Sequence, residues 1–362
     1  MRVLIDTTFE RRGPSGTGVY IRSLIDALRA AGVEVLEAAN QRRPPPAGGG
    51  PGSARNLLGD RWWTEFALPR HARRLGADVL HHPLPAHARR AGCPQMVTVH
   101  DLAFEVWPDL FAPRFRVWAR RAHRVASQRA QAVVCVSHAT AGDVLRRWGI
   151  PESRIVVAHH GPGQFGRDTE QSASRTETAA WTGAARHLLY VGDDEPRKNV
   201  GLLIEAYRRY VERRSSALPL VLAGGAQRPD AGAQSGPRAG PDAGIQVETH
   251  PDRDRLARLY ADAAALVHPS RHEGFGLTLV EAMHLGVPVV TAASAATREV
   301  CGDAARYVDA GDAEGLAGEL DRLTDDERLR RDLSRRGLAR AAQFSWERSA
   351  RAHIEAYTLA LR

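Results

Sequence analysis

Two glutamates and a glycine loop at residues 273–281 (EGFGLTLVE) could bind a ligand with an anionic centre. The apolar run that ends at His268 predicts a buried strand, and the spacing after the loop predicts a helix. Unpaired N–H groups at a helix N-terminus attract phosphate, and Gly274 and Gly276 let a ligand approach the backbone closely. Flanking carboxylates would repel the phosphate but suit hydroxyl groups beside it, as in a nucleotide-sugar. An ordinary turn with two solvated glutamates is the alternative.

Two adjacent cations, Arg197 and Lys198, follow another predicted strand at 187–192. At the carboxyl edge of a sheet they could neutralise a departing diphosphate, as a divalent metal does in other enzymes. Lys198 is the only lysine among 50 Lys and Arg residues, so the abundance of arginine indicates codon bias better than a binding face. The alternative is an exposed turn with two solvated cations.

No metal site is expected. Cys93, Cys135 and Cys301 are scattered without paired spacing, which disfavours both zinc sites and disulfides. The D-x-D pair Asp252 and Asp254 opens an amphipathic helical pattern, so helix capping explains these acids better than metal binding.

No dinucleotide cofactor is expected either. The first glycine loop contains Gly13, Gly16 and Gly18 but lacks the G-x-G-x-x-G pattern. No acidic residue ends a clear second strand, as an NAD-binding fold would require.

The length and the net charge of the chain limit the class of protein to which it can belong. The chain has 362 residues, 43% of them hydrophobic, which is enough for two domains with separate cores. No apolar run approaches the ~20 residues of a membrane span, and the first residues predict a strand rather than a signal peptide. We therefore expect a cytoplasmic protein, with contact at the inner face of a membrane left open. The net charge of +8 favours anionic partners, but no nucleic-acid module is present.

Strands and helices alternate along both halves, which predicts an α/β fold with two doubly wound parallel sheets. We expect domains at 1–165 and 187–345, joined by a linker or insertion at 166–186. The last helix, at about 346–362, could fold back on the first domain. The Pro/Gly-rich segment 41–55 predicts a loop.

Polar residues in the first half follow predicted strands, at the edge where α/β sheets bind ligands. They are His82, His100, Asp101 and Ser137. Trp62, Trp63 and Phe66 follow the Pro/Gly-rich segment, and a core position is favoured over a pocket lining.

A basic helix is predicted around 111–124. Phe111, Phe115, Trp118 and Ala122 share one face, and arginines occupy the rest. A helix packed on the sheet with a solvated basic side is favoured over a membrane-surface or lipid-acceptor role.

The motifs together resemble the retaining family 4 glycosyltransferases, which have the GT-B fold: two Rossmann-like domains that face each other across a cleft. The resemblance is carried by PRKN and EGFGLTLVE in the right order, with GTGVY, VHD, LYADAAALVHPS and VPVVTAASAATREVCGDAARYVD as flanking matches. It covers nearly the whole chain apart from the Pro/Gly/Ser-rich stretches.

The resemblance implies a nucleotide-sugar donor bound mainly by the C-terminal domain. Arg197 and Lys198 would hold the diphosphate, Glu273 the hexose hydroxyls and Glu281 the ribose hydroxyls. His100 would lie over the reacting sugar. The other implied donor-binding positions are Gly16, Gly18, Gly274, Phe275, Gly276, Leu277 and Thr278.

The acceptor would enter from the N-terminal domain, past Trp62, Trp63, Asp101, Phe104 and Trp107. The resemblance implies transfer of a hexose with retention, without metal or cofactor, from a GDP- or UDP-linked donor, with a mild preference for mannose. A glycan, a lipid-linked molecule or a natural product all fit as acceptor. A nucleotide-sugar epimerase and a non-catalytic binding subunit are the alternatives.

Two features depart from the family pattern. Asp193 and Asp194 add negative charge beside the expected diphosphate and could pair with arginines. The first loop also carries Arg11 and Arg12, which have no assigned role.

Overall fold

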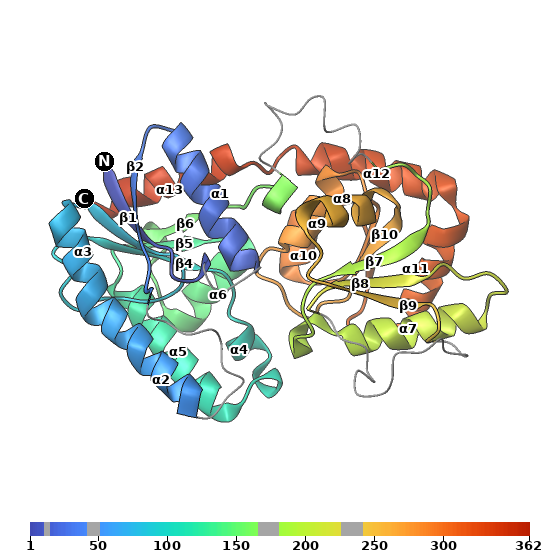
Figure 1. The fold of residues 1–362 in the computed structure, drawn as a ribbon, viewed down its shortest axis with the longest axis horizontal. Coiled ribbons are helices and arrows are strands. Elements are labelled where there is room, and N and C mark those ends of the chain that lie inside the picture. The colour runs from blue at the N-terminus through green and yellow to red at the C-terminus, as the bar shows by residue number, and fades with distance from the viewer. Residues whose placement is uncertain (11–14, 42–50, 166–180, 226–241) are drawn as a thin grey trace. The chain divides into compact units, whose positions relative to one another are not determined.

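The chain divides into two compact units. In a computed structural model the first unit contains Met1–Gly163 and Ser345–Arg362, and the second contains Gln164–Phe344. Each unit holds a six-stranded parallel sheet with helices on both faces (Figure 1), so the predicted fold class is confirmed. The structure describes residues 1–10, 15–41, 51–165, 181–225 and 242–362. Arg11, Arg12 and Gly13 lie outside these residues.

The first sheet has the order β2-β1-β3-β4-β5-β6. All neighbouring strands are parallel, so their carboxyl ends share one edge. His82, His100, Asp101 and Ser137 lie at that edge, as predicted. The strands are β1 (Arg2–Asp6), β2 (Glu34–Ala38), β3 (Val79–His82), β4 (Gln95–Val99), β5 (Ala132–Cys135) and β6 (Ile155–Val157).

The helices of the first unit differ from the prediction at two places. Gly16 and Gly18 lie in the first turn of a helix rather than in a loop, because the Ser15 hydroxyl caps it by accepting from Gly18 N at 3.1 Å. Residues 51–55 begin a helix, while 42–50 lie outside the described residues. The helices are α1 (Gly16–Ala30), α2 (Pro51–Trp62), a π-helix (Trp63–Ala67), α3 (Leu68–Leu75), α4 (Ala103–Val106), α5 (Pro113–Arg129), α6 (His138–Trp148) and α13 (Trp346–Ala360).

Helix α5 buries a different face from the one predicted. Ala119 and Ala126 are buried, whereas Phe115 and Trp118 are 45% and 44% exposed. The small alanine side chains let the helix approach its neighbours closely, and this turns the aromatic residues outward. The predicted burial of the Phe115 face is therefore wrong.

A buried polar network joins α13 to the first sheet. The hydroxyl of Tyr20 lies 2.9 Å from both Thr98 Oγ1 and His353 Nε2. His81 lies 2.9 Å from Thr98 Oγ1 through Nε2 and 2.9 Å from the Tyr357 hydroxyl through Nδ1. Residues far apart in the sequence thus satisfy one another's polar atoms inside the unit, and α13 packs against α1 and β5 (Figure 1).

The second sheet has the order β12-β11-β10-β7-β8-β9, again parallel throughout. Its strands are β7 (His187–Val191), β8 (Leu220–Gly224), β9 (Ile245–Thr249), β10 (Ala263–His268), β11 (Val289–Ala292) and β12 (Ala305–Val308). Its helices are α7 (Val200–Glu212), α8 (Arg253–Ala261), α9 (Leu277–His284), α10 (Ala295–Cys301), α11 (Ala313–Asp325) and α12 (Glu327–Ala341).

Several predictions for the second unit can be compared with its contacts. Asp252 caps α8 by accepting from Arg255 N at 2.7 Å, so the capping interpretation is confirmed. Asp193 accepts from Gly225 N at 3.1 Å. Neither it nor Asp194 pairs with an arginine of the described residues, so that expectation is wrong. The predicted linker is described only from residue 181, where Trp181 Nε1 donates to Ala263 O at 2.8 Å and so belongs to the second unit's packing.

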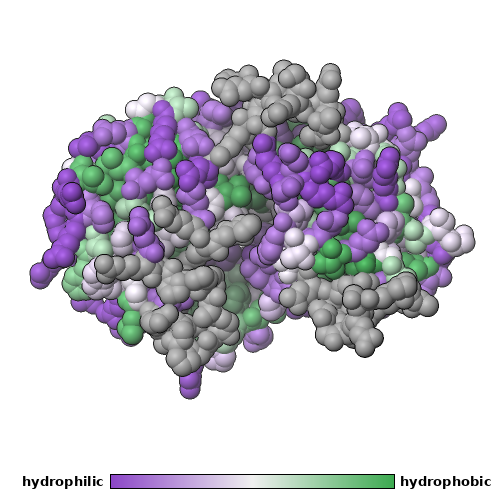
Figure 2. All heavy atoms as spheres, in the orientation of Figure 1, coloured by the Kyte–Doolittle hydropathy of each residue, from purple (hydrophilic) through white to green (hydrophobic). Residues whose placement is uncertain are grey.

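Among the described residues on the face drawn in Figure 2, hydrophilic side chains predominate and hydrophobic ones show between them in separate patches. Among the helices that the structure describes, none combines the length and the apolar composition needed to cross a bilayer.

The network beneath α13 should weaken on acidification. Burial lowers the pKa of His353 to about 4 and that of His81 well below its ordinary value. Between about pH 6.5 and 4 the folded unit therefore binds fewer protons than the unfolded chain. For each such histidine, the free energy of unfolding decreases by about 1.4 kcal/mol for every unit by which the pH falls. Hydrogen-exchange protection factors of α13 should fall across this window, with α11 of the second unit as internal control. Unchanged protection of α13 would contradict the analysis.

Candidate functional site

Two loops of the second unit meet because their strands are neighbours. β7 and β10 pair in parallel, so the segments after Val191 and His268 leave the same edge of the sheet. A short 3-10 helix (Pro196–Lys198) follows β7. The loop after β10 holds this helix in place, since Arg271 N and Ser270 Oγ donate to Arg197 O at 2.8 and 3.1 Å.

Three basic side chains converge on the carboxylate of Glu273. Lys198 Nζ lies 2.6 Å and His268 Nε2 lies 3.1 Å from Glu273 Oε1, and Arg197 Nη1 lies 3.2 Å from Oε2. The Glu273 side chain is only 8% exposed, and those of Lys198 and Arg197 are 14% and 19% exposed. The two stretches singled out from the sequence therefore form one buried charge cluster.

The cluster fixes the protonation of its members. Burial alone would raise the pKa of Glu273, but the charges of Lys198 and Arg197, with the hydrogen bond from His268, hold that pKa well below its usual range. Burial lowers the pKa of His268. Arg197 Nε also lies 2.8 Å from Oε2 of Glu195, whose side chain is 50% exposed, so two cations face two carboxylates beside the His268 imidazole.

The N-terminus of α9 lies at the end of the same loop. Gly276 precedes the helix with φ +93°, and a Cβ there would lie 2.7 Å from Leu279 Cδ1, so a glycine is required. No side chain caps this terminus. The N–H groups of Leu277 and Thr278 have no acceptor in the described part of the chain, which leaves them available to an anion.

The cluster keeps spare hydrogen-bonding capacity. Lys198 has three N–H donors, and Glu273 is its only acceptor among the described residues. Glu273 has about four lone-pair positions, and the cluster uses three of them. An oxyanion and a hydroxyl group could each be bound without breaking the existing contacts.

Glu281 lies near the other end of the predicted stretch and is buried. It accepts from Gln164 N at 3.1 Å through Oε1 and from the Tyr260 hydroxyl at 3.2 Å through Oε2. Burial raises the pKa of Glu281 to about 7, although both hydrogen bonds oppose the shift. It therefore titrates near neutral pH, unlike Glu273.

The remaining loop positions provide backbone rather than side chains. Phe275 is buried and packs edge-on against Phe344, with ring centroids 5.6 Å apart, and Gly274 is buried beside it.

Sequence reasoning missed His268. Its place at the carboxyl end of β10 is the same signal that pointed to His82 and His100 in the first half.

The first unit places the predicted catalytic histidine at its sheet edge. His100 Nε2 donates to Pro83 O at 3.0 Å, which assigns the ring proton to Nε2. Burial lowers the pKa of His100. Asp101 accepts from Ala103 N at 2.9 Å just before α4, and Phe104 is buried in the core against His123.

The predicted acceptor-side tryptophans have different surroundings. Trp63 is buried and donates through Nε1 to Asp6 Oδ2 at 3.1 Å. Trp62 and Phe66 are exposed, so the favoured core interpretation is wrong for these two residues. Trp107 is 39% exposed. Gly16 and Gly18 belong to the first unit, and their predicted contribution to donor binding stays a prediction.

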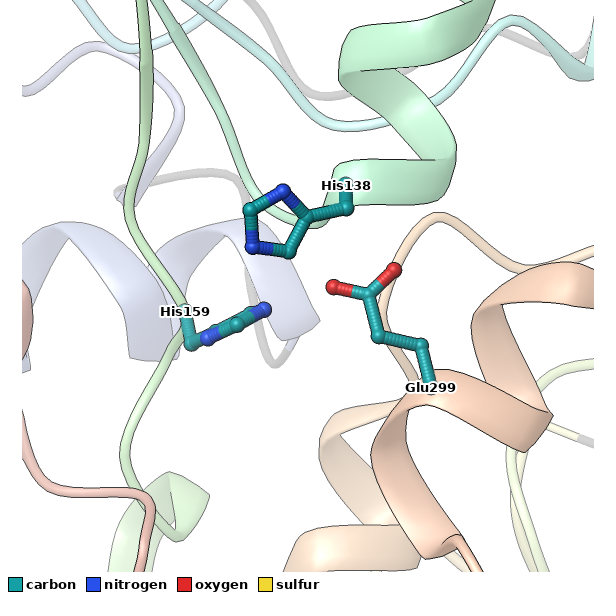
Figure 3. A group of neighbouring side chains, drawn as sticks. All are labelled: His138, His159 and Glu299. Atoms are coloured by element: carbon teal, nitrogen blue, oxygen red, sulfur yellow. The ribbon is translucent and has the colours of Figure 1, made fainter.

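Two further histidines of the first unit lie together. His138 begins α6 and His159 follows β6, and their ring centroids are 5.6 Å apart (Figure 3). Glu299, also drawn there, belongs to α10 of the second unit. Sequence reasoning did not pair these histidines, because the contact depends on the fold.

Comparison with known proteins identifies the family. Residues 14–161 match Glycosyltransferase Family 4, and residues 179–340 match Glycosyl transferases group 1. The chain is 32% identical over 291 residues to the O-antigen chain mannosyltransferase B of Escherichia coli, covering 78% of this chain and 74% of that protein.

Solved structures share the fold. Sucrose-phosphate synthase from Thermosynechococcus elongatus has a TM-score of 0.74 at 19% identity, covering 99% of this chain and 98% of that one. An Anabaena protein solved in complex with UDP-glucose has a TM-score of 0.68 at 17% identity, covering 98% of both chains. The motifs, the two parallel sheets and these matches agree: the chain belongs to glycosyltransferase family 4, has the GT-B fold and is a glycosyltransferase.

Proposed function

We propose that the protein transfers a hexose, with mannose favoured, from a GDP- or UDP-linked donor to a hydroxyl group of an acceptor, with retention at the anomeric carbon. The observation that carries the proposal is the convergence of Lys198 and Arg197 on buried Glu273, beside the uncapped N-terminus of α9. Mannose is favoured because the E. coli relative is named a mannosyltransferase.

Each part of the donor has a matching group in the second unit. The diphosphate is bound by the spare donors of Lys198, by Arg197 and by the N–H groups of Leu277 and Thr278. Glu273 accepts a hexose hydroxyl through its remaining lone pair, and Glu281 accepts the ribose hydroxyls. Gly274, Phe275 and Gly276 contribute backbone groups beside the sugar.

The reaction needs no metal in this scheme. The acceptor oxygen attacks the anomeric carbon on the face from which the diphosphate departs, and the acceptor proton passes to the departing phosphate oxygen. Negative charge grows on the diphosphate during this step. Lys198 and Arg197 stabilise it from fixed positions, which is the largest contribution an enzyme site usually makes. The family resemblance assigns His100 to the reacting sugar, and Gly16 and Gly18 of α1 to a close approach of the diphosphate.

The acceptor and the location of the protein belong to the same proposal. The acceptor is a glycan, a lipid-linked molecule or a natural product, bound by the first unit near Trp63, Asp101 and Trp107. We place the protein in the cytoplasm, with peripheral contact at the inner face of the membrane. An epimerase would need no acceptor, and a binding subunit would give no product, so product analysis separates these alternatives.

Replacing Lys198 by Ala should abolish most of the activity while leaving the fold intact, because Arg197 and Glu273 remain paired with each other. We expect kcat to fall about 100- to 1,000-fold, the effect of removing one stabilising donor. Lys198→Arg should recover part of the loss. Steady-state kinetics with GDP-mannose and UDP-glucose as donors would measure this.

The control is Arg328→Ala, an exposed cation on α12 of the same unit, which should retain wild-type kcat and melting temperature. Normal turnover by folded Lys198→Ala would show that this residue does not stabilise the leaving group.

Donor affinity should depend on pH through Glu281. Its carboxyl, with a pKa of about 7, accepts hydroxyl groups better when ionised. KM for the donor should therefore decrease between pH 6 and 8 in the wild-type enzyme and stay flat in Glu281→Gln. A pH-dependent KM that persists in the variant would assign the effect to another group.

Donor identity can be tested by thermal shift with GDP-, UDP-, ADP- and dTDP-sugars. A donor at 100 times its Kd should stabilise the second unit by about 2.7 kcal/mol, and the shift should be smaller in Lys198→Ala. No shift with any of them would count against donor binding at this cluster.

A further inference from the structure

A large cavity lies wholly within the first unit, away from the charge cluster of the second. Its volume is about 1080 Å³, at the upper end of the ~300–1,000 Å³ typical of small-molecule sites. The walls come from α2, from α5 and from the segment 82–89 that follows β3. Trp63, one of the predicted acceptor-side residues, lines it as well.

The walls of the cavity are mainly apolar and extend to exposed side chains. Leu58 on α2 is 68% exposed, and Val117 and Trp118 on α5 are 66% and 44% exposed. Large apolar side chains gathered around an open cavity indicate a ligand with a hydrophobic body.

Arginines line the same cavity. Arg114 and Arg121 lie on α5 beside the apolar wall, and Arg61 lies on α2. In the described part of the chain none of the three has an ion-pair partner. These cations suit an anionic group on the ligand, and arginine forks suit phosphate in particular.

Acidic side chains of the cavity offset this charge only in part. Asp6 accepts from Trp63, and Glu65 pairs with Arg89 at 3.6 Å. Asp60 is the third acid in the lining. The lining contains five arginines against these three acids, so positive charge dominates.

The lining includes His82, which has a buried ring nitrogen without a partner in the described part of the chain. His82 donates from Nε2 to Gln95 Oε1 at 3.0 Å, because that oxygen also accepts from Ala88 N. His82 Nδ1 therefore carries a lone pair, and it has no hydrogen bond to any described residue. His82 is 1% exposed. The lone pair suits a hydroxyl donor.

The cavity also adjoins the predicted reaction centre. Pro83 lines it, and the carbonyl oxygen of Pro83 accepts from His100. Thr8, directly after β1, lines it too, so the cavity runs along the carboxyl edge of the first sheet, where α/β folds bind ligands.

We propose that this cavity binds a lipid phosphate as the acceptor: a hydrocarbon chain against Leu58, Val117 and Trp118, a phosphate or diphosphate at Arg114 and Arg121, and a linked sugar toward His82 and His100. The role of this ligand as the acceptor rests on the proposed function, but its binding to the cavity does not require turnover. A purely polar glycan would leave the apolar wall unused, and a bilayer surface would not need an enclosed cavity.

The test is calorimetric titration of the full chain with farnesyl diphosphate, with farnesol and inorganic diphosphate as separate arms. Farnesyl diphosphate should bind, and each fragment should bind at least about tenfold more weakly, since chain and phosphate each contribute. Arg114→Ala/Arg121→Ala and Val117→Asp should each weaken binding about tenfold or more. The three positions are exposed, so these variants should fold.

The matched control is Arg116→Ala/Arg124→Ala, which removes the same charge from α5 at positions outside the cavity lining and should leave affinity within about twofold. Equal losses of affinity in the two double variants would overturn the proposal, because they would indicate a general attraction of the basic helix for anions. Binding of the protein to phosphatidylglycerol vesicles that displaces farnesyl diphosphate would overturn it as well.

Titration of Lys198→Ala separates this proposal from the proposed function. Undiminished binding of farnesyl diphosphate supports the cavity, whereas its loss would place the probe at the donor cluster and overturn the inference. A donor thermal shift that is absent while farnesyl diphosphate still binds would instead contradict the proposed donor chemistry alone.

Discussion

The buried pairing of Glu273 with Lys198 and Arg197 is the interaction on which the second unit's site depends. Moving such charges out of water costs several kcal/mol per ion, and a protein with apolar residues of similar size in their place would often be at least as stable. The cluster is therefore poor evidence for stability and better evidence for binding. Arg197 also pairs with Glu195 at 2.8 Å, so the two cations are matched by two carboxylates and each member is paired before a ligand arrives.

The fold makes this cluster possible because parallel strands end at one edge. β7 and β10 are neighbours in the sheet although a long stretch of sequence separates them, and their following loops must meet. Hydrogen bonds from Ser270 and Arg271 to the Arg197 carbonyl then fix the short 3-10 helix. Asn199 adds a link by donating to Pro269 O and Ala310 O at 3.2 and 2.8 Å. Backbone contacts thus position the cations before any ligand is bound.

The sequence predicted what depends on periodicity and on spacing: the two parallel sheets, the Asp252 cap, and the approach of Arg197 and Lys198 to Glu273. It failed where tertiary packing decides. Nothing local distinguishes the alanine face of α5 from its aromatic face. His268 looked like the end of an apolar run, and its contact with Glu273 exists only once the loop has folded back. The cavity of the first unit could not be predicted either, because its lining residues come from separate elements.

The two proposed ligand sites differ in how their charges are placed. In the second unit the charges are largely buried and already paired, so salt screens them weakly and recognition depends on geometry. In the first unit the arginines of the α5 wall are exposed and strongly screened, so they contribute less per charge and the apolar wall must supply most of the affinity. An activated sugar carries compact, fixed charge and suits the buried, paired charges of the second unit. A long amphipathic acceptor has a large apolar area and one anionic group. It suits the apolar wall and exposed arginines of the first unit, where binding avoids an excessive desolvation cost.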